Sequence, residues 1–89
     1  MYNPAARHKM STYNPETLEL VRGAVARIKE VDLAGVGAAD GLNLDSVDRI
    51  GLIAELENVF GLELPSDAIA PEVFDTLASL ATMVDASRR

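Results

Sequence analysis

Three stretches of this sequence repeat apolar residues at the spacing of an α-helix, and none shows a convincing strand alternation. The pair Asn14-Pro15 suits a helix cap followed by the first helical position, and predicts a helix over about 14–31. A second helix is expected over about 46–60, because Gly61 ends the apolar pattern. The apolar residues at helical spacing are Leu18, Val21, Val25 and Ile28 in the first helix, and those that can face inward in the second are Val47, Ile50, Ile53, Leu56 and Phe60.

The last third of the chain predicts one short turn and a final helix. The short turn runs from Ser66-Asp67 through Ala70 and is expected to stop at Pro71. Asp75 or Thr76 can cap the final helix, whose inward residues are Leu77, Leu80, Ala81 and Val84. Between the first two helices, three glycines and the apolar anchors Leu33, Val36 and Leu42 predict an ordered loop.

These elements predict an all-α fold, a small four-helix bundle with three main helices, one short helix and a long first loop. Eighty-nine residues suffice for one domain with a modest core. We expect the domain to span 14–86, after a disordered leader over 1–13 and before a tail over 87–89.

Composition excludes several kinds of site and compartment. No cysteine is present, so neither a disulfide nor a thiolate metal site can hold the fold, and a reducing cytoplasm is the expected location. No apolar run approaches the length of a membrane span, so we expect no membrane partner. His8 is the single histidine and lies in the expected leader, which excludes a Ser-His-acid relay. No calcium-loop spacing or phosphate-binding glycine motif occurs, so we expect no metal and no nucleotide.

Charge is distributed unevenly along the chain. The formal net charge is −6, and from Asp40 to Asp85 there are ten acids and one base, Arg49. Such a surface repels nucleic acid and attracts basic protein surfaces, although acidity alone also serves solubility.

Ser46 is the residue on which a functional hypothesis depends. A serine at the start of a helix has a purely structural explanation, since its hydroxyl can cap the helix and stabilise it by about 1 kcal/mol. The surrounding pattern favours another interpretation. It runs through Leu42-Asn43-Leu44-Asp45-Ser46-Val47-Asp48, Ile50, Leu52-Ile53, Leu56-Glu57, Phe60 and Glu63-Leu64-Pro65, and it resembles the signature of the acyl carrier protein family over about residues 16–85.

The resemblance implies a freestanding, monomeric and non-catalytic carrier. In that family the matching serine receives 4'-phosphopantetheine from coenzyme A through a magnesium-dependent phosphopantetheinyl transferase, and the arm then holds cargo as a thioester. Ser46 is therefore the implied attachment residue. The implied partners are this transferase, an acyl- or aminoacyl-loading ligase or transferase, and downstream biosynthetic enzymes with basic docking surfaces. The implied cargo is an intermediate of fatty acid-like, polyketide or other specialised biosynthesis.

The resemblance also implies a docking surface around the second helix. Its acids are Asp45, Asp48, Glu55 and Glu57, while Val47 and Ile50 can add apolar contacts, although the helical spacing places Ile50 in the core. Arg49 belongs to the same surface and alters it, because typical fatty-acid-synthesis carriers are uncharged there. Gly51 stands where those carriers are acidic. A glycine inside a helix indicates either close packing by a neighbour or local flexibility of the helix that is useful in docking.

Further differences concern the loop and Val47, which replaces the more common leucine of the family. Asn43 stands where many members have glycine, and asparagine tolerates unusual backbone angles. The loop before Ser46 is shorter than is common in the family. We therefore do not assume that a long acyl chain can be sheltered inside the bundle.

Other functions remain open at this point. The same mechanism could serve an activated amino acid instead of an acyl group. A purely structural or regulatory bundle that binds a basic partner and is never modified is a different class, in which Ser46→Ala would leave function intact. An autonomous enzyme would need a site built from carboxylates.

Overall fold

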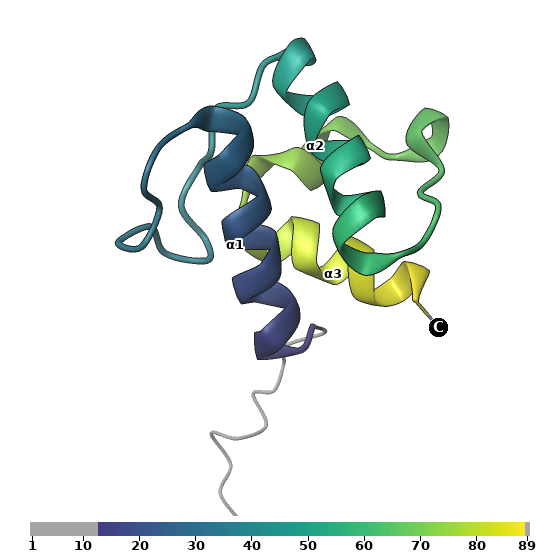
Figure 1. Ribbon diagram of the computed structural model, residues 1–89, viewed down its shortest axis with the longest axis horizontal. Coiled ribbons are helices and arrows are strands. Elements are labelled where there is room, and N and C mark those ends of the chain that lie inside the picture. Colours follow the sequence, from purple (N-terminus) through teal and green to yellow (C-terminus); the bar gives the residue numbers. More distant parts are fainter. Residues whose placement is uncertain (1–12, 89) are drawn as a thin grey trace, which may run out of the picture.

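The computed structural model describes residues 13–88, which form three α-helices and two 3₁₀ turns (Figure 1). In chain order these are α1 (Pro15–Lys29), α2 (Ser46–Phe60), η2 (Ser66–Ala68), η3 (Pro71–Asp75) and α3 (Leu77–Ser87). No strand occurs within this part of the chain. The predicted all-α bundle with a long first loop is confirmed.

Side-chain caps define where two of the helices begin. The Asn14 side chain accepts a hydrogen bond of 2.8 Å from the Glu16 backbone N–H, so the predicted cap of α1 is confirmed. At α3, Thr76 is the cap and Asp75 is not, because the Thr76 hydroxyl accepts from the Ser79 N–H while the Ser79 hydroxyl accepts from the Thr76 N–H. Helix boundaries were therefore readable from local capping chemistry.

The segment between α2 and α3 differs from the prediction. One short turn was expected, stopped by Pro71, but Pro71 instead begins the second turn, η3. Proline suits the first position of a helical turn, because its missing N–H would have no partner there and its φ is already helical. The extra turn brings Phe74 into the core, where it is buried.

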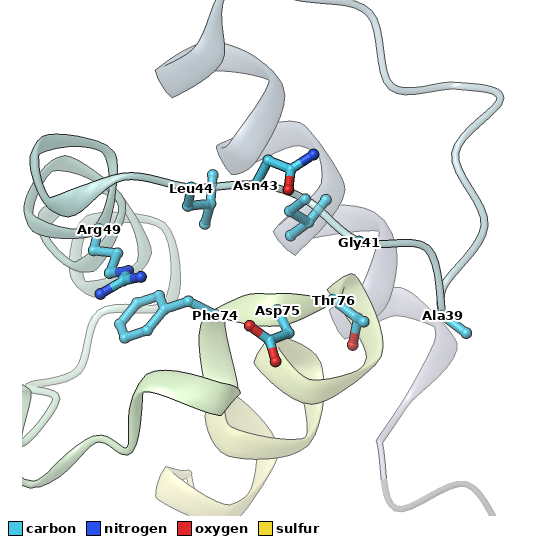
Figure 2. Close-up of a pocket in the computed structure, with 9 residues that line it drawn as sticks. Ala39, Gly41, Asn43, Leu44, Arg49, Phe74, Asp75 and Thr76 are labelled. Atoms are coloured by element: carbon cyan, nitrogen blue, oxygen red, sulfur yellow. The ribbon is translucent and has the colours of Figure 1, made fainter.

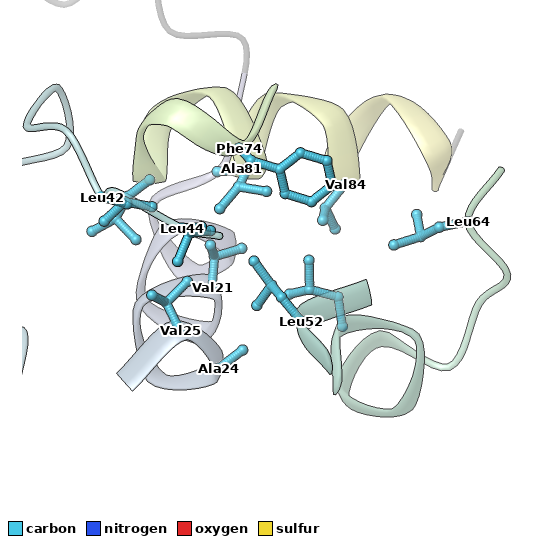
Figure 3. Packing of buried hydrophobic residues seen from close by; sticks show 13 residues of the cluster. Val21, Ala24, Val25, Leu42, Leu44, Leu52, Leu64, Phe74, Ala81 and Val84 are labelled. Carbon is cyan, nitrogen blue, oxygen red and sulfur yellow. The ribbon is translucent and has the colours of Figure 1, made fainter. Parts of the chain in front are cut away.

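The core lies where α1 packs against both α2 and α3 (Figure 3). Leucine, valine and alanine dominate it, as the scarcity of aromatic residues requires. All four residues predicted to face inward from α3 are buried. The buried hydrophobic residues are Val21, Ala24, Val25, Leu42, Leu44, Leu52, Leu56, Leu64, Phe74, Leu77, Leu80, Ala81 and Val84.

The inward face of α2 was partly mispredicted. Val47 and Ile50, which helical spacing allowed to face inward and the resemblance assigned to docking, are 77% and 71% exposed, whereas Leu52 is fully buried. Apolar residues occur around most of this helix, so helical spacing alone allowed more than one inward face. Packing against α1 selects the face with Leu52 and Leu56 and leaves the face with Val47 and Ile50 in solvent.

Hydrogen bonds attach the loop between α1 and α2 to the bundle near both of its ends. The Arg22 guanidinium donates to the backbone carbonyls of Leu33 and Val36. Further along, the Leu42 N–H donates to the Asp75 carbonyl at 2.9 Å. The loop is thus ordered by polar contacts as well as by the predicted apolar anchors, and it delivers the chain to the start of α2.

Gly51 lies where α2 approaches α1. A Cβ at this position would lie 3.3 Å from the Ile28 Cδ1 atom, closer than ordinary van der Waals contact. Of the two explanations offered by the sequence, close packing by a neighbour is therefore the one that the structure supports.

The ends of the folded part differ slightly from the expected domain bounds. Tyr13 packs against the core, although it was assigned to the leader, and α3 continues through Ser87. The Arg88 guanidinium then lies 5.4 Å from the centre of the Phe60 ring. The rest of the expected leader, residues 1–12, lies outside the described residues. Across 13–88, no helix is both long and apolar enough to cross a membrane.

Candidate functional site

Ser46 is the first residue of α2, and its side chain is exposed. It does not cap the helix, because Asp45 does: the Asp45 carboxylate accepts from the Asp48 N–H at 2.8 Å, and the Asp48 carboxylate accepts from the Asp45 N–H at 3.3 Å. The purely structural explanation of Ser46 is therefore wrong. Within residues 13–88 its hydroxyl has no hydrogen-bond partner and remains available for chemistry.

Lys29, at the end of α1, holds the start of α2 in place. Its ammonium group lies 3.3 Å from the Asp48 carboxylate and 3.4 Å from the Asn43 carbonyl oxygen. Asn43 itself has φ of 56°, in the left-handed region. Asparagine tolerates this region, which fits its place where many members of the family have glycine. These contacts join α1, the loop and α2 immediately before Ser46.

The environment of Asp48 stabilises its charged form. The hydrogen bond from the Asp45 backbone N–H is the largest cause that lowers the pKa of Asp48 below its ordinary value of 3.8, and Lys29 lowers it further, against a partial loss of hydration. The carboxylate is thus held ionised at the helix N-terminus, where the helix dipole also favours negative charge.

This shift predicts a pH dependence of stability. Because the pKa of Asp48 is lower in the folded chain, its stabilising contribution is present above pH 3.8 and is lost as the pH falls through the folded value. We expect Asp48→Asn to lower the urea midpoint at pH 7 and to lower it less at pH 3. Glu63→Gln, which removes one exposed carboxylate after α2, is the charge-matched control. An equal deficit of Asp48→Asn at both pH values would contradict this assignment.

A groove begins at Ser46 and runs between α2 and the η2–η3 segment. Its volume is about 350 Å³. The lining is largely apolar, and Arg49 and Asp67 are its charged residues. The lining residues are Ser46, Arg49, Ile50, Ile53, Asp67, Ile69, Pro71 and Phe74. The attachment residue implied by the sequence therefore stands beside a cavity.

The predicted docking residues fall into two groups. Asp45, Val47, Asp48, Arg49 and Ile50 lie within one turn or so of Ser46. Glu55 and Glu57 are further along α2, roughly 13–17 Å from Ser46 at 1.5 Å per residue. Both of these carboxylates have partners inside the fold: Glu55 accepts from Arg27 at 2.6 Å, and Glu57 accepts from the Leu64 N–H at 2.8 Å.

Two residues of the site escaped the sequence analysis. Lys29 contributes the contact to Asp48, and Phe74 lies under the Arg49 guanidinium, 5.8 Å from the guanidinium carbon to the ring centre (Figure 2). The basic end of the first helix was a weak signal for Lys29. Nothing local indicated Phe74, because η3 was not predicted.

The described residues contain no histidine or cysteine, and no three acidic side chains among them gather so as to hold a metal ion. Ser46 therefore has no imidazole base beside it in this part of the chain.

A comparison of the chain with known proteins identifies its family. The family model described as the phosphopantetheine attachment site matches residues 19–84, well over half of the chain. No curated protein and no solved structure matches the chain significantly. Members of this family carry covalently attached 4'-phosphopantetheine and are generally non-catalytic, and they work with phosphopantetheinyl transferases and biosynthetic enzymes. With its all-helical bundle and exposed serine, this chain belongs to the phosphopantetheine attachment site family, among the acyl carrier proteins.

Proposed function

We propose that Ser46 is the residue that accepts 4'-phosphopantetheine, and that the chain carries acyl intermediates of fatty acid-like, polyketide or other specialised biosynthesis. The observation that carries this proposal is the exposed Ser46 hydroxyl, which is left free because Asp45 and Asp48 cap the helix between them. When attached, the arm supplies a terminal thiol on which cargo is held as a thioester.

The start of α2 suits the phosphodiester that attachment would leave on Ser46. The first N–H groups of a helix have no partner within the helix, and the dipole places partial positive charge there. Both favour an anion at this position. Since no histidine lies among the described residues, the hydroxyl depends on the transferase for its activation.

We further propose that partners dock on the surface around Ser46. Val47 and Ile50 are the most exposed large apolar side chains beside it and can enter an apolar depression on a partner. Asp45, Asp48 and Arg49 lie in the same turn, and the acidic character of this segment favours encounter with basic surfaces. Glu55 and Glu57 would extend this docking surface along α2.

The experiment that tests attachment is an intact-mass measurement. The purified chain is incubated with coenzyme A, Mg²⁺ and a broad-specificity phosphopantetheinyl transferase, and the modified residue is located by fragmentation. We expect one phosphopantetheine to be added, on the peptide that contains Ser46.

Two results would contradict the proposal. Modification of another serine would move the attachment site, and the absence of any addition to a folded, initially unmodified sample would leave an acidic helical binding module.

A further inference from the structure

Arg49 lies on the same side of α2 as Ser46, because residues three apart are neighbours on a helix. Like the other charged residues of the helix, it is partly buried. It turns inward toward η3 and places its guanidinium against the Phe74 ring (Figure 2). The single base among ten acids is therefore half-buried beside the predicted attachment residue.

The Arg49 guanidinium has no hydrogen-bond acceptor among the described residues. Its Nε atom is buried and has no hydrogen-bond partner within residues 13–88. Asp67 and Asp75 line the adjoining cavities, but neither forms an ion pair with it. By contrast, the other arginines of this part of the chain have carboxylate partners: Arg22 with Glu19, Arg27 with Glu55, and Arg88 with Asp85.

An unpaired charged donor that is partly removed from water is unfavourable. Stacking on Phe74 offsets only part of this cost, since a cation–π contact is weaker than a charge-assisted hydrogen bond. Arg49 is thus a donor group for which the described part of the unmodified chain offers no acceptor.

Two cavities meet at Arg49 and Phe74. One is the groove of about 350 Å³ that begins at Ser46. The other, of about 450 Å³, extends toward Asn43 and Thr76. Among residues 13–88, Arg49 is the one basic residue in either lining, so a group attached to Ser46 that enters the groove meets this guanidinium among largely apolar neighbours.

We propose that Arg49 binds an oxyanion carried by the arm on Ser46. The proposal rests on the proposed function, in which Ser46 is the attachment residue. The planar guanidinium suits two oxygens of a phosphate or carboxylate, and binding would provide the acceptor that the unmodified chain lacks. The oxyanion has two possible sources, the phosphodiester next to Ser46 and a carboxylate on the cargo.

The test follows the Arg49 Nε–H resonance by NMR and the thermal midpoint Tm in four forms of the protein. These are the unmodified chain, the chain with the arm alone, and the chain with an amide-linked acyl group that ends either in a carboxylate or, at equal length, in a methyl group. A shift of the Nε–H on adding the arm identifies the phosphodiester, and a shift only with the carboxylate-ended chain identifies the cargo. In the responding form we expect Tm to rise by roughly 4–8 °C, the shift that about 1 kcal/mol produces in a domain of this size.

Arg49→Met separates this role from a structural one. We expect the unmodified variant to be at least as stable as the parent, because an apolar side chain replaces an unpaired donor, and to lose the rise in Tm. Arg27→Met, which removes an arginine from α1, is the matched control and should keep the rise. If Arg49→Met does not fold, the Nε–H spectra of the four forms of the parent chain still test whether Arg49 binds the oxyanion.

An unchanged Arg49 resonance in all four forms would overturn the proposal while leaving attachment to Ser46 intact. If no arm can be added at all, the proposed function itself is wrong. The intact-mass measurement shows this independently of the Arg49 spectra.

Discussion

Replacing Ser46 with alanine is expected to abolish phosphopantetheine incorporation completely while leaving the fold intact. The loss is total because attachment needs the hydroxyl oxygen itself. The fold is retained because this side chain is exposed and Asp45, not Ser46, caps α2. Exposed substitutions of this kind change the free energy of unfolding by at most about 0.5 kcal/mol. Intact mass after incubation with the transferase gives the first result, and urea unfolding gives the second.

Ser87→Ala is the matched control, since it removes an exposed hydroxyl from a different helix, at the last residue of α3. It should accept the arm as the parent does. Incorporation into Ser46→Ala at the rate of the parent would refute Ser46 as the attachment residue. A Ser46→Ala protein that unfolds would instead contradict the capping arrangement described for Asp45.

The largest effect on stability is expected from Leu52→Ala. Leu52 is fully buried where α2 meets the core, and removing a buried leucine side chain costs about 2–5 kcal/mol through lost burial and the cavity left behind. A domain of this size has a total stability of roughly 4–13 kcal/mol, so the variant would lose a large fraction of it. Urea unfolding monitored by circular dichroism measures the difference.

Ile50→Ala is the control that makes this test specific, because it removes a similar side chain two residues earlier on the same helix. Ile50 is 71% exposed, so its loss should change stability by less than about 1 kcal/mol. Equal losses of stability in the two variants would contradict the burial of Leu52 and the exposure of Ile50. They would favour the other inward face of α2, the one that contains Ile50.

Much of the fold could be predicted because the relevant signals are local. Asn14 and Thr76 cap the helices that they precede, and Leu77, Leu80, Ala81 and Val84 form one apolar stripe that allowed a single inward face for α3. Capping and one-sided periodicity act within one or two turns, so they are legible without a tertiary structure.

The prediction failed where a choice depended on distant neighbours. In α2 the apolar residues surround most of the helix, and packing against α1 decided that Leu52 is buried and Ile50 is not. Pro71 could either end one turn or begin another, and its place before the buried Phe74 decided the latter.

The sequence by itself determined that the chain is an all-helical carrier with a serine at the head of its second helix, because caps, periodicity and the motif are local patterns. The tertiary structure decided what surrounds that serine and which charged group has no acceptor within residues 13–88. The Asp45–Asp48 cap is local, but Lys29 reaches Asp48 from α1 only in the folded chain. Arg49 has no acceptor in the part of the chain that the structure describes, where η3 places Phe74, and no carboxylate, against its guanidinium. Contacts between residues far apart in sequence depend on the packing of whole elements, which no single segment encodes.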